Sequence, residues 1–124
     1  MDQEAFSALV AIALDSLPEE FLDRMENIDV VVEDWPRRED LEQVGLDPRD
    51  RAALLGLYHG VPLTHRGAQY AALPDIVTIY KGPIERLCGD DEEQIRRQVQ
   101  HTVIHEIAHY YGISDERLDE LGYD

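Results

Sequence analysis

One stretch decides how this chain folds, and it reads His101-Thr-Val-Ile-His105-Glu106-Ile-Ala-His109-Tyr-Tyr-Gly112-Ile-Ser-Asp115. Its first part ends the longest predicted helix, which Asp90 or Asp91 caps and which runs to Tyr111. Gly112 suits the left-handed backbone conformation that commonly ends helices. The opposite side of this helix carries an apolar stripe that we expect to pack on a sheet, formed by Ile95, Val99, Val103 and Ile107.

Two histidines within this helix have the spacing of a zinc site. Residues four apart on an α-helix differ by about 40° around the axis and lie roughly 6 Å apart along it. His105 and His109 can therefore direct their imidazoles at one point, in the pattern H-E-x-x-H. Zinc needs a third protein ligand, and Asp115 supplies a carboxylate once the chain reverses at Gly112. We therefore expect His105, His109 and Asp115 to hold zinc.

Glu106 is the expected general base. Zinc lowers the pKa of bound water toward ~7, so a carboxylate beside the metal can take its proton near neutral pH. The competing interpretation of an isolated H-E-x-x-H pattern is chance occurrence on a solvated helix face, but the helical context, Gly112 and Asp115 favour the metal site. His101 precedes His105 by one turn, and we expect it either to assist the site or simply to be a hydrogen-bonded histidine near it.

Few other side chains receive a role. A tyrosine is expected to stabilise the oxyanion of the reaction, with Tyr123 favoured over Tyr110 and Tyr111. The loop histidines, His59 and His65, are assigned no function. Cys88 is the only cysteine, so an internal disulfide is excluded and no oxidising compartment is required.

The remaining segments predict an α+β domain that spans residues 1–124, with the short mixed sheet packed on the long helix. Further helices are expected over residues 3–15, from Ser16 to about Met25, and from a Ser114 cap through Glu120. Strands are expected at Ile28–Glu33, 54–58 and 76–80, and residues 34–50 are expected to form a loop with at most one helical turn.

The third predicted strand is flanked by proline on both sides. Pro74 precedes it and Gly82-Pro83 follows it. Because proline cannot donate a hydrogen bond to a ladder, we expect residues 76–80 to form an edge strand.

The charge balance limits the partners of the protein. The chain carries 27 acidic and 11 basic residues, which gives a net charge of −16. This field opposes binding to nucleic-acid phosphates and to anionic lipid headgroups, so neither nucleic acid nor a membrane is an expected partner. It favours neutral or cationic substrates, or simply a highly soluble surface. The acidic N-terminus does not begin like a signal peptide, and no apolar run approaches the ~20 residues that cross a bilayer, so we expect a cytoplasmic protein.

The segment from His101 to Asp115 resembles the zincin superfamily, and most closely the aspartate-ligand zincins known as minimal zincins or zincin-like metallopeptidases. The pattern H-E-x-x-H-x-x-G-x-x-D carries most of the likeness, which extends from about Leu54 onward. The resemblance implies a zincin-like α+β fold and hydrolysis of peptide bonds, with zinc ligands at His105, His109 and Asp115 and with Glu106 as base. It also implies that an edge strand, here residues 76–80, lies above the active-site helix and binds extended peptide or protein substrate.

One departure from the larger zincins leaves a second function open. Metzincins carry a methionine beneath the metal, whereas the two methionines here, Met1 and Met25, lie far from the motif. That floor would have to come from Leu118, Leu121 or Tyr123. The alternative to a metallopeptidase is a non-catalytic metal-binding or protein-interaction module, whose edge strand recruits a partner or a second copy as a homodimer. Glu106 favours the enzyme, because a helix that only binds metal has no use for a carboxylate there.

Overall fold

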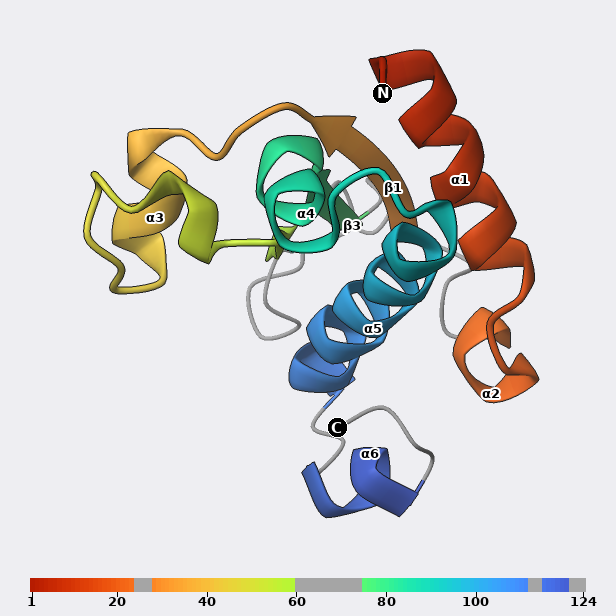
Figure 1. Ribbon diagram of the computed structural model, residues 1–124. Coiled ribbons are helices and arrows are strands. Elements are labelled where there is room, and N and C mark those ends of the chain that lie inside the picture. Colours follow the sequence, from red (N-terminus) through yellow and green to blue (C-terminus); the bar gives the residue numbers. More distant parts are fainter. Residues whose placement is uncertain (24–27, 60–74, 112–114, 121–124) are drawn as a thin grey trace.

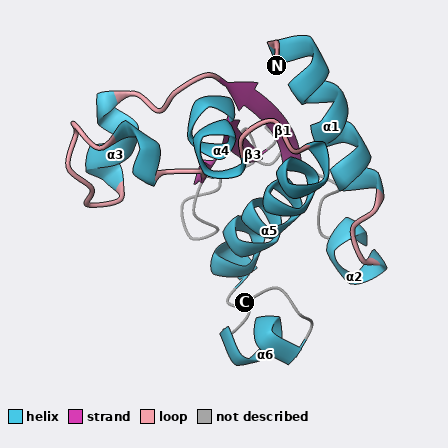
Figure 2. Cartoon of the chain, viewed as in Figure 1, coloured by secondary structure: helices cyan, strands magenta, loops and turns pink. Residues whose placement is uncertain are grey.

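The computed structural model describes residues 1–23, 28–59, 75–111 and 115–120, and these residues form an α+β fold, as expected (Figures 1 and 2). One mixed sheet has the order β1-β3-β2: β1 (Ile28–Glu33) pairs parallel to β3 (Asp75–Tyr80), and β2 (Gly56–His59) pairs antiparallel to β3. The helices are α1 (Gln3–Asp15), α2 (Glu19–Leu22), α3 (Arg38–Gln43), α4 (Lys81–Cys88), α5 (Glu92–Tyr111) and α6 (Asp115–Glu120), and a short 3-10 turn, η2 (Arg51–Ala53), precedes β2.

Helix α5 matches its prediction closely. The Asp91 carboxylate accepts hydrogen bonds from the N–H groups of Glu93 and Gln94, at 3.1 and 3.2 Å, so Asp91 is the cap. Helix α1 lies alongside α5 in Figure 1, and the Gln100 side chain joins the two by donating to the Ala13 carbonyl at 2.9 Å. The predicted apolar stripe is fully buried, at Ile95, Val99, Val103 and Ile107.

The main core lies between one face of the sheet and the helices. Val77 and Ile79 of β3 are fully buried in it. Phe6 of α1 and Phe21 of α2 pack into the same cluster, together with the stripe of α5. Leu118 of α6 is also fully buried there, so the chain returns to the core after α5 has ended.

The other face of the sheet buries a second, smaller core. Leu57 of β2 and Tyr80 of β3 pack there with Leu41 of α3 and with Leu54. The Tyr80 hydroxyl donates a 2.9 Å hydrogen bond to Asp40, which satisfies both buried polar groups. Because successive strand side chains point to opposite faces, this short sheet is covered on both sides.

The prediction that residues 76–80 form an edge strand is wrong. Within the described residues β3 is central, with β1 on one side and β2 on the other. The strand ends at Tyr80, so the ladder does not include Gly82 or Pro83, while Pro74 lies outside the described residues. The edge strand that contacts α5 is β2, at Gly56–His59 rather than at 54–58.

Helix α4 was not expected from the sequence. Gly82-Pro83 resembles a break, yet both residues lie in the first turn of this helix, where the missing N–H of proline has no intrahelical partner to lose. Gly89 ends the helix with a positive φ of 66°. Helix α3 likewise occupies part of the expected loop, since the Asp40 carboxylate accepts the Arg37 N–H at 3.0 Å and stabilises its first turn.

The remaining boundaries agree with the sequence prediction where the structure describes them, except at α2. Helix α1 and strand β1 have the predicted bounds. Helix α2 is shorter than predicted: it begins at Glu19, with Pro18 rather than Ser16 at its N-terminal cap, and it ends at Leu22. The Ser16 hydroxyl instead donates to the Ile12 carbonyl of α1. Met25 and the predicted Ser114 cap lie outside the described residues. Among the helices that the structure describes, none combines the length and the apolar character needed to cross a membrane.

Candidate active site

A cavity of about 290 Å³ lies between α5 and the chain that leads into β2. From α5 it is bordered by His101, His105 and Glu106, which occupy the flank of the helix beside the buried stripe. From the other side it is bordered by Leu55 and Gly56. Both histidines are half-buried and border this cavity, so they are not enclosed in the core. One side of α5 therefore packs in the core, and its polar flank forms a wall of the cavity.

Glu106 is held against the edge strand. Its Oε2 accepts a hydrogen bond from the backbone N–H of Tyr58, at 3.2 Å. Tyr58 pairs with Val77 on the β3 side of the strand. The contact fixes the Glu106 carboxylate against the backbone of β2.

The close approach of β2 to α5 depends on a glycine. A Cβ built on Gly56 would lie 2.5 Å from Cγ2 of Thr102 and 3.1 Å from the carbonyl oxygen of Thr78. Thr102 is only 5% exposed, so its methyl group has little room to move aside. Gly56 is thus required here by space rather than by backbone conformation, since its φ is not positive.

A buried carboxylate holds Tyr58 from the other end. The Tyr58 hydroxyl donates to Oδ2 of Asp75 at 2.6 Å, and Asp75 is only 6% exposed. Asp75 begins β3, two residues before the register partner of Tyr58. The Asp75 side chain therefore connects Tyr58, whose backbone N–H binds Glu106, to the central strand of the sheet. Sequence reasoning missed both residues, because no local pattern joins positions 58, 75 and 106.

His101 lies directly beside His105. Their ring centroids are 4.6 Å apart and the ring planes are tilted by 40°. Both rings border the same cavity. His101 is therefore a neighbour of the predicted ligand, which agrees with either of the two roles expected for it.

The structure describes the side chains of two of the four predicted site residues. His105 and Glu106 border one cavity. The backbone of His109 lies in the last turn of α5 and that of Asp115 begins α6, but their side chains lie outside the described part of the structure. Among the side chains that are described, no group of three could hold a metal ion.

Of the other residues named in the sequence analysis, some lie within the described part of the structure and some lie outside it. His59 belongs to β2 and lies two residues after Leu57, on the sheet face of the smaller core and away from Glu106, so it takes no part in this cavity. The side chains of Tyr110 and Tyr111 lie outside the described residues, as do the whole of His65, Gly112, Leu121 and Tyr123.

Two contacts join helix α6 to the body of the fold. Leu118 is buried in the same cluster as Ile107 and Ala108 of α5. On the same short helix, Arg117 lies 3.5 Å from the Glu20 carboxylate of α2. Helix α6 therefore packs back on the body of the fold, and Asp115 is its first residue.

Two comparisons find known proteins that this chain is similar to. Residues 25–123 match the family described as zincin-like metallopeptidase. Among solved structures, a conserved hypothetical protein from T. thermophilus has the same fold, with a TM-score of 0.56 and 22% sequence identity over 99% of this chain and 100% of the other. No curated protein matches the chain.

Proposed function

Because the chain belongs to the zincin-like metallopeptidase family, we propose that it is a zinc-dependent peptidase in which Glu106 is the general base. His105, His109 and Asp115 are the proposed metal ligands. One observation carries the proposal: His105 and Glu106 border the same cavity, and the Glu106 carboxylate lies against the backbone of edge strand β2.

The proposed donor set fits zinc. Two imidazoles and one carboxylate leave a position open, which is typical of catalytic rather than structural zinc. Helix α5 is continuous through His109 to Tyr111, so positions 105 and 109 are one turn apart on a regular helix. When bound, zinc would supply a Lewis acid that polarises a peptide carbonyl and acidifies water.

The residues of the chain would perform the remaining steps. An extended peptide would add to the outer edge of β2, which takes the place of the edge strand expected at residues 76–80. The Glu106 carboxylate already accepts the Tyr58 N–H, so such a peptide would lie beside the carboxylate and would take over this donor wherever it paired with Tyr58. Glu106 would take a proton from the attacking water and deliver it to the departing amine.

The tyrosine expected to stabilise the oxyanion stays a prediction. Tyr123 is favoured over Tyr110 and Tyr111. Tyr58 is a poorer candidate, because its hydroxyl proton is donated to Asp75. A cytoplasmic location is part of the proposal, since the single cysteine calls for no oxidising compartment.

Metal content and cleavage test the proposal separately. We expect one zinc per chain by elemental analysis, lost in His105→Ala and His109→Ala but kept in His59→Ala, the control on the other face of the sheet. A diverse peptide library should be cut by the wild type and not by Glu106→Ala, which should keep zinc. Equal cleavage by both would contradict the role of Glu106. Zinc binding with no cleavage by either would favour the non-catalytic metal-binding or interaction module.

A further inference from the structure

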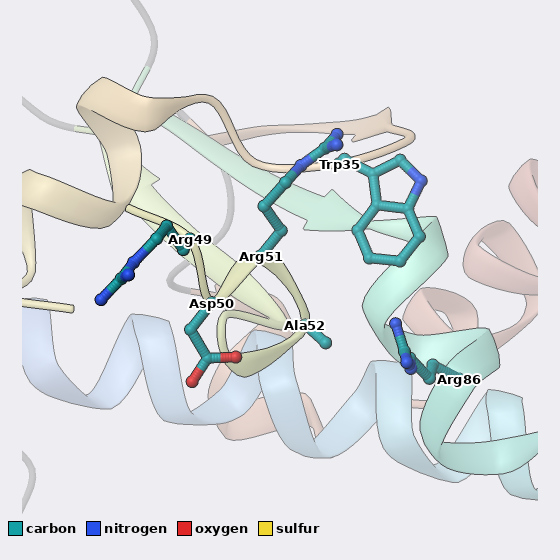
Figure 3. A pocket seen from close by; sticks show the side chains of 6 residues that line it. All are labelled: Trp35, Arg49, Asp50, Arg51, Ala52 and Arg86. Carbon is teal, nitrogen blue, oxygen red and sulfur yellow. The ribbon is translucent and has the colours of Figure 1, made fainter. Parts of the chain in front are cut away.

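A second cavity, of about 650 Å³, lies where η2 packs against α4 (Figure 3). We call it the Trp35 cavity, and the residues that border it are Trp35, Arg49, Asp50, Arg51, Ala52 and Arg86. Three of the 11 basic residues of the chain gather here, against one aspartate, although the whole chain has a net charge of −16. A local concentration of positive charge in so acidic a protein indicates a binding site for an anion.

The indole that forms one wall is held in place by its neighbours. A Cβ built on Gly82 would collide with the ring of Trp35, so the indole lies against the first turn of α4. The guanidinium carbon of Arg51 lies 5.1 Å from the ring centroid, within the range of a cation–π interaction. Trp35 and Arg51 therefore form a preorganised pair at the edge of the cavity.

The three arginines differ in what they already bind. Arg49 makes two side-chain hydrogen bonds with Asp47, at 2.9 and 3.1 Å, and in Figure 3 it points away from the indole. Arg51 and Arg86 form no ion pair with any side chain that the structure describes. In Figure 3 the guanidinium of Arg86 points toward the indole. Two guanidinium groups thus remain to bind an anion, and their planar donor sets match carboxylate and phosphate.

The Trp35 cavity adjoins the candidate active site. Ala52 borders the former, and the next residue, Ala53, borders the cavity beside Glu106. The same segment then leads into β2 at Gly56. The two cavities are therefore neighbours along the segment that leads into β2, which also carries Arg51.

We propose that the Trp35 cavity binds an acidic side chain of a peptide, through Arg51 and Arg86. A peptide that lies along β2 would carry this residue a short distance from the bond above Glu106, so the preferred substrates have Asp or Glu at that position. The link to cleavage rests on the function proposed above, whereas binding of the carboxylate does not.

This assignment reverses, at one position, the preference for neutral or cationic substrates expected from net charge. Exposed charges farther apart than about 8 Å are largely screened at physiological ionic strength. The two guanidinium groups would touch the ligand, so they outweigh the acidic residues outside the cavity and the single carboxylate, Asp50, that borders it. A phosphate polymer would instead meet the acidic field over its whole length, which favours a peptide carboxylate over nucleic acid.

Trp35 is the only tryptophan of the chain, so its fluorescence reports on this cavity directly. Titration with a blocked tri-glutamate peptide should give a saturable change, whereas the tri-glutamine peptide should give none. Arg86→Gln should weaken the binding about ten-fold, as expected for the loss of a charge-assisted contact. Arg96→Gln, which removes the same charge from an exposed position on α5, should leave it unchanged.

Three results would overturn the proposal. An equal response to tri-glutamine, or equal weakening in Arg96→Gln, would mean that the cavity does not recognise carboxylate. A response to inorganic phosphate without one to tri-glutamate would identify a site for a small anion instead. The titration is repeated in Glu106→Gln and without zinc. If these proteins still bind tri-glutamate but the wild type cleaves no peptide, the proposed peptidase activity alone is refuted. If the wild type cleaves peptides but does not bind tri-glutamate, only this binding site is refuted.

Discussion

The backbone N–H of Tyr58 donates a 3.2 Å hydrogen bond to the carboxylate of Glu106, across a separation of 48 residues. The contact ties the edge of the sheet to the helix that carries the metal-binding pattern. A single side chain therefore has two duties: it supports the packing of β2 on α5, and it is the proposed base. Substitutions that preserve one duty and remove the other can separate them.

Glu106→Gln should remove the base and keep the contact. The amide oxygen of glutamine can still accept the Tyr58 N–H, so the free energy of unfolding should change by less than about 0.5 kcal/mol. Peptide cleavage should fall by about 10²–10⁴-fold, the usual contribution of a positioned acid–base group. Glu106→Ala should lose as much activity and about 1 kcal/mol more stability, because it also loses the hydrogen bond. Urea denaturation and peptide cleavage measure the two effects, and equal stability of both variants would contradict the structural duty.

Gly56→Ala tests how closely β2 must approach α5. The new methyl group would overlap Cγ2 of Thr102, so we expect a loss of about 1–3 kcal/mol. Removal of that methyl group in the double variant Gly56→Ala/Thr102→Ser should restore part of the loss. The Thr78 carbonyl oxygen, which would lie 3.1 Å from the new carbon, would prevent full recovery. Urea denaturation of the single and double variants checks this, and additive losses would refute the assigned contact.

The sequence predicted those features that depend on neighbouring residues. Asp91, the apolar stripe and the two histidines lie within one helical segment, where 3.6-residue periodicity and capping chemistry act locally. Strand β1 was also predicted with its observed bounds, since its β-branched residues favour a strand wherever they pack. The polar flank of α5 followed from the same periodicity.

Features that depend on distant segments were not predictable. The central position of β3 is set by its two partners, and the flanking proline pattern said nothing about either. The link from Asp75 through Tyr58 to Glu106 joins three elements, and the Trp35 cavity brings Trp35 together with η2 and α4. Each such group arises from tertiary packing, which no window of sequence contains. Helix α4 was missed for a different reason, because proline in a first turn has the opposite meaning from proline inside a helix.

Tyr58→Phe should weaken the support of the edge strand without touching the proposed metal ligands. The substitution removes one hydrogen bond from the nearly buried Asp75, which should reduce stability by about 1–3 kcal/mol. Zinc content should not change, whereas cleavage should decrease because Glu106 is held by the same residue. In a double-mutant cycle with Asp75→Asn, the two losses should be less than additive. Strict additivity would show that the hydroxyl and the carboxylate act independently.

The buried pair of Asp40 and Tyr80 should make stability depend on pH at both extremes. Burial by itself would raise the pKa of the Asp40 carboxyl, but hydrogen bonds from the Arg37 N–H and the Tyr80 hydroxyl outweigh it and hold that pKa below its usual value. Burial, and then the bond to Asp40, raise the pKa of the Tyr80 hydroxyl.

The sign of each effect follows from which state binds protons more tightly. Because the folded state lowers the pKa of Asp40, its contribution is present above the unfolded value of about 4 and is lost as the pH falls below it. Because the folded state raises the pKa of Tyr80, that contribution is present below about pH 10 and is lost as the pH rises further. Urea denaturation from pH 3 to pH 11 should show Asp40→Asn with a shallower acid limb and Tyr80→Phe with a shallower alkaline limb. Asp29→Asn, at an exposed position of β1, is the control, and an acid limb that it flattens as much as Asp40→Asn does would attribute the effect to net charge rather than to the buried pair.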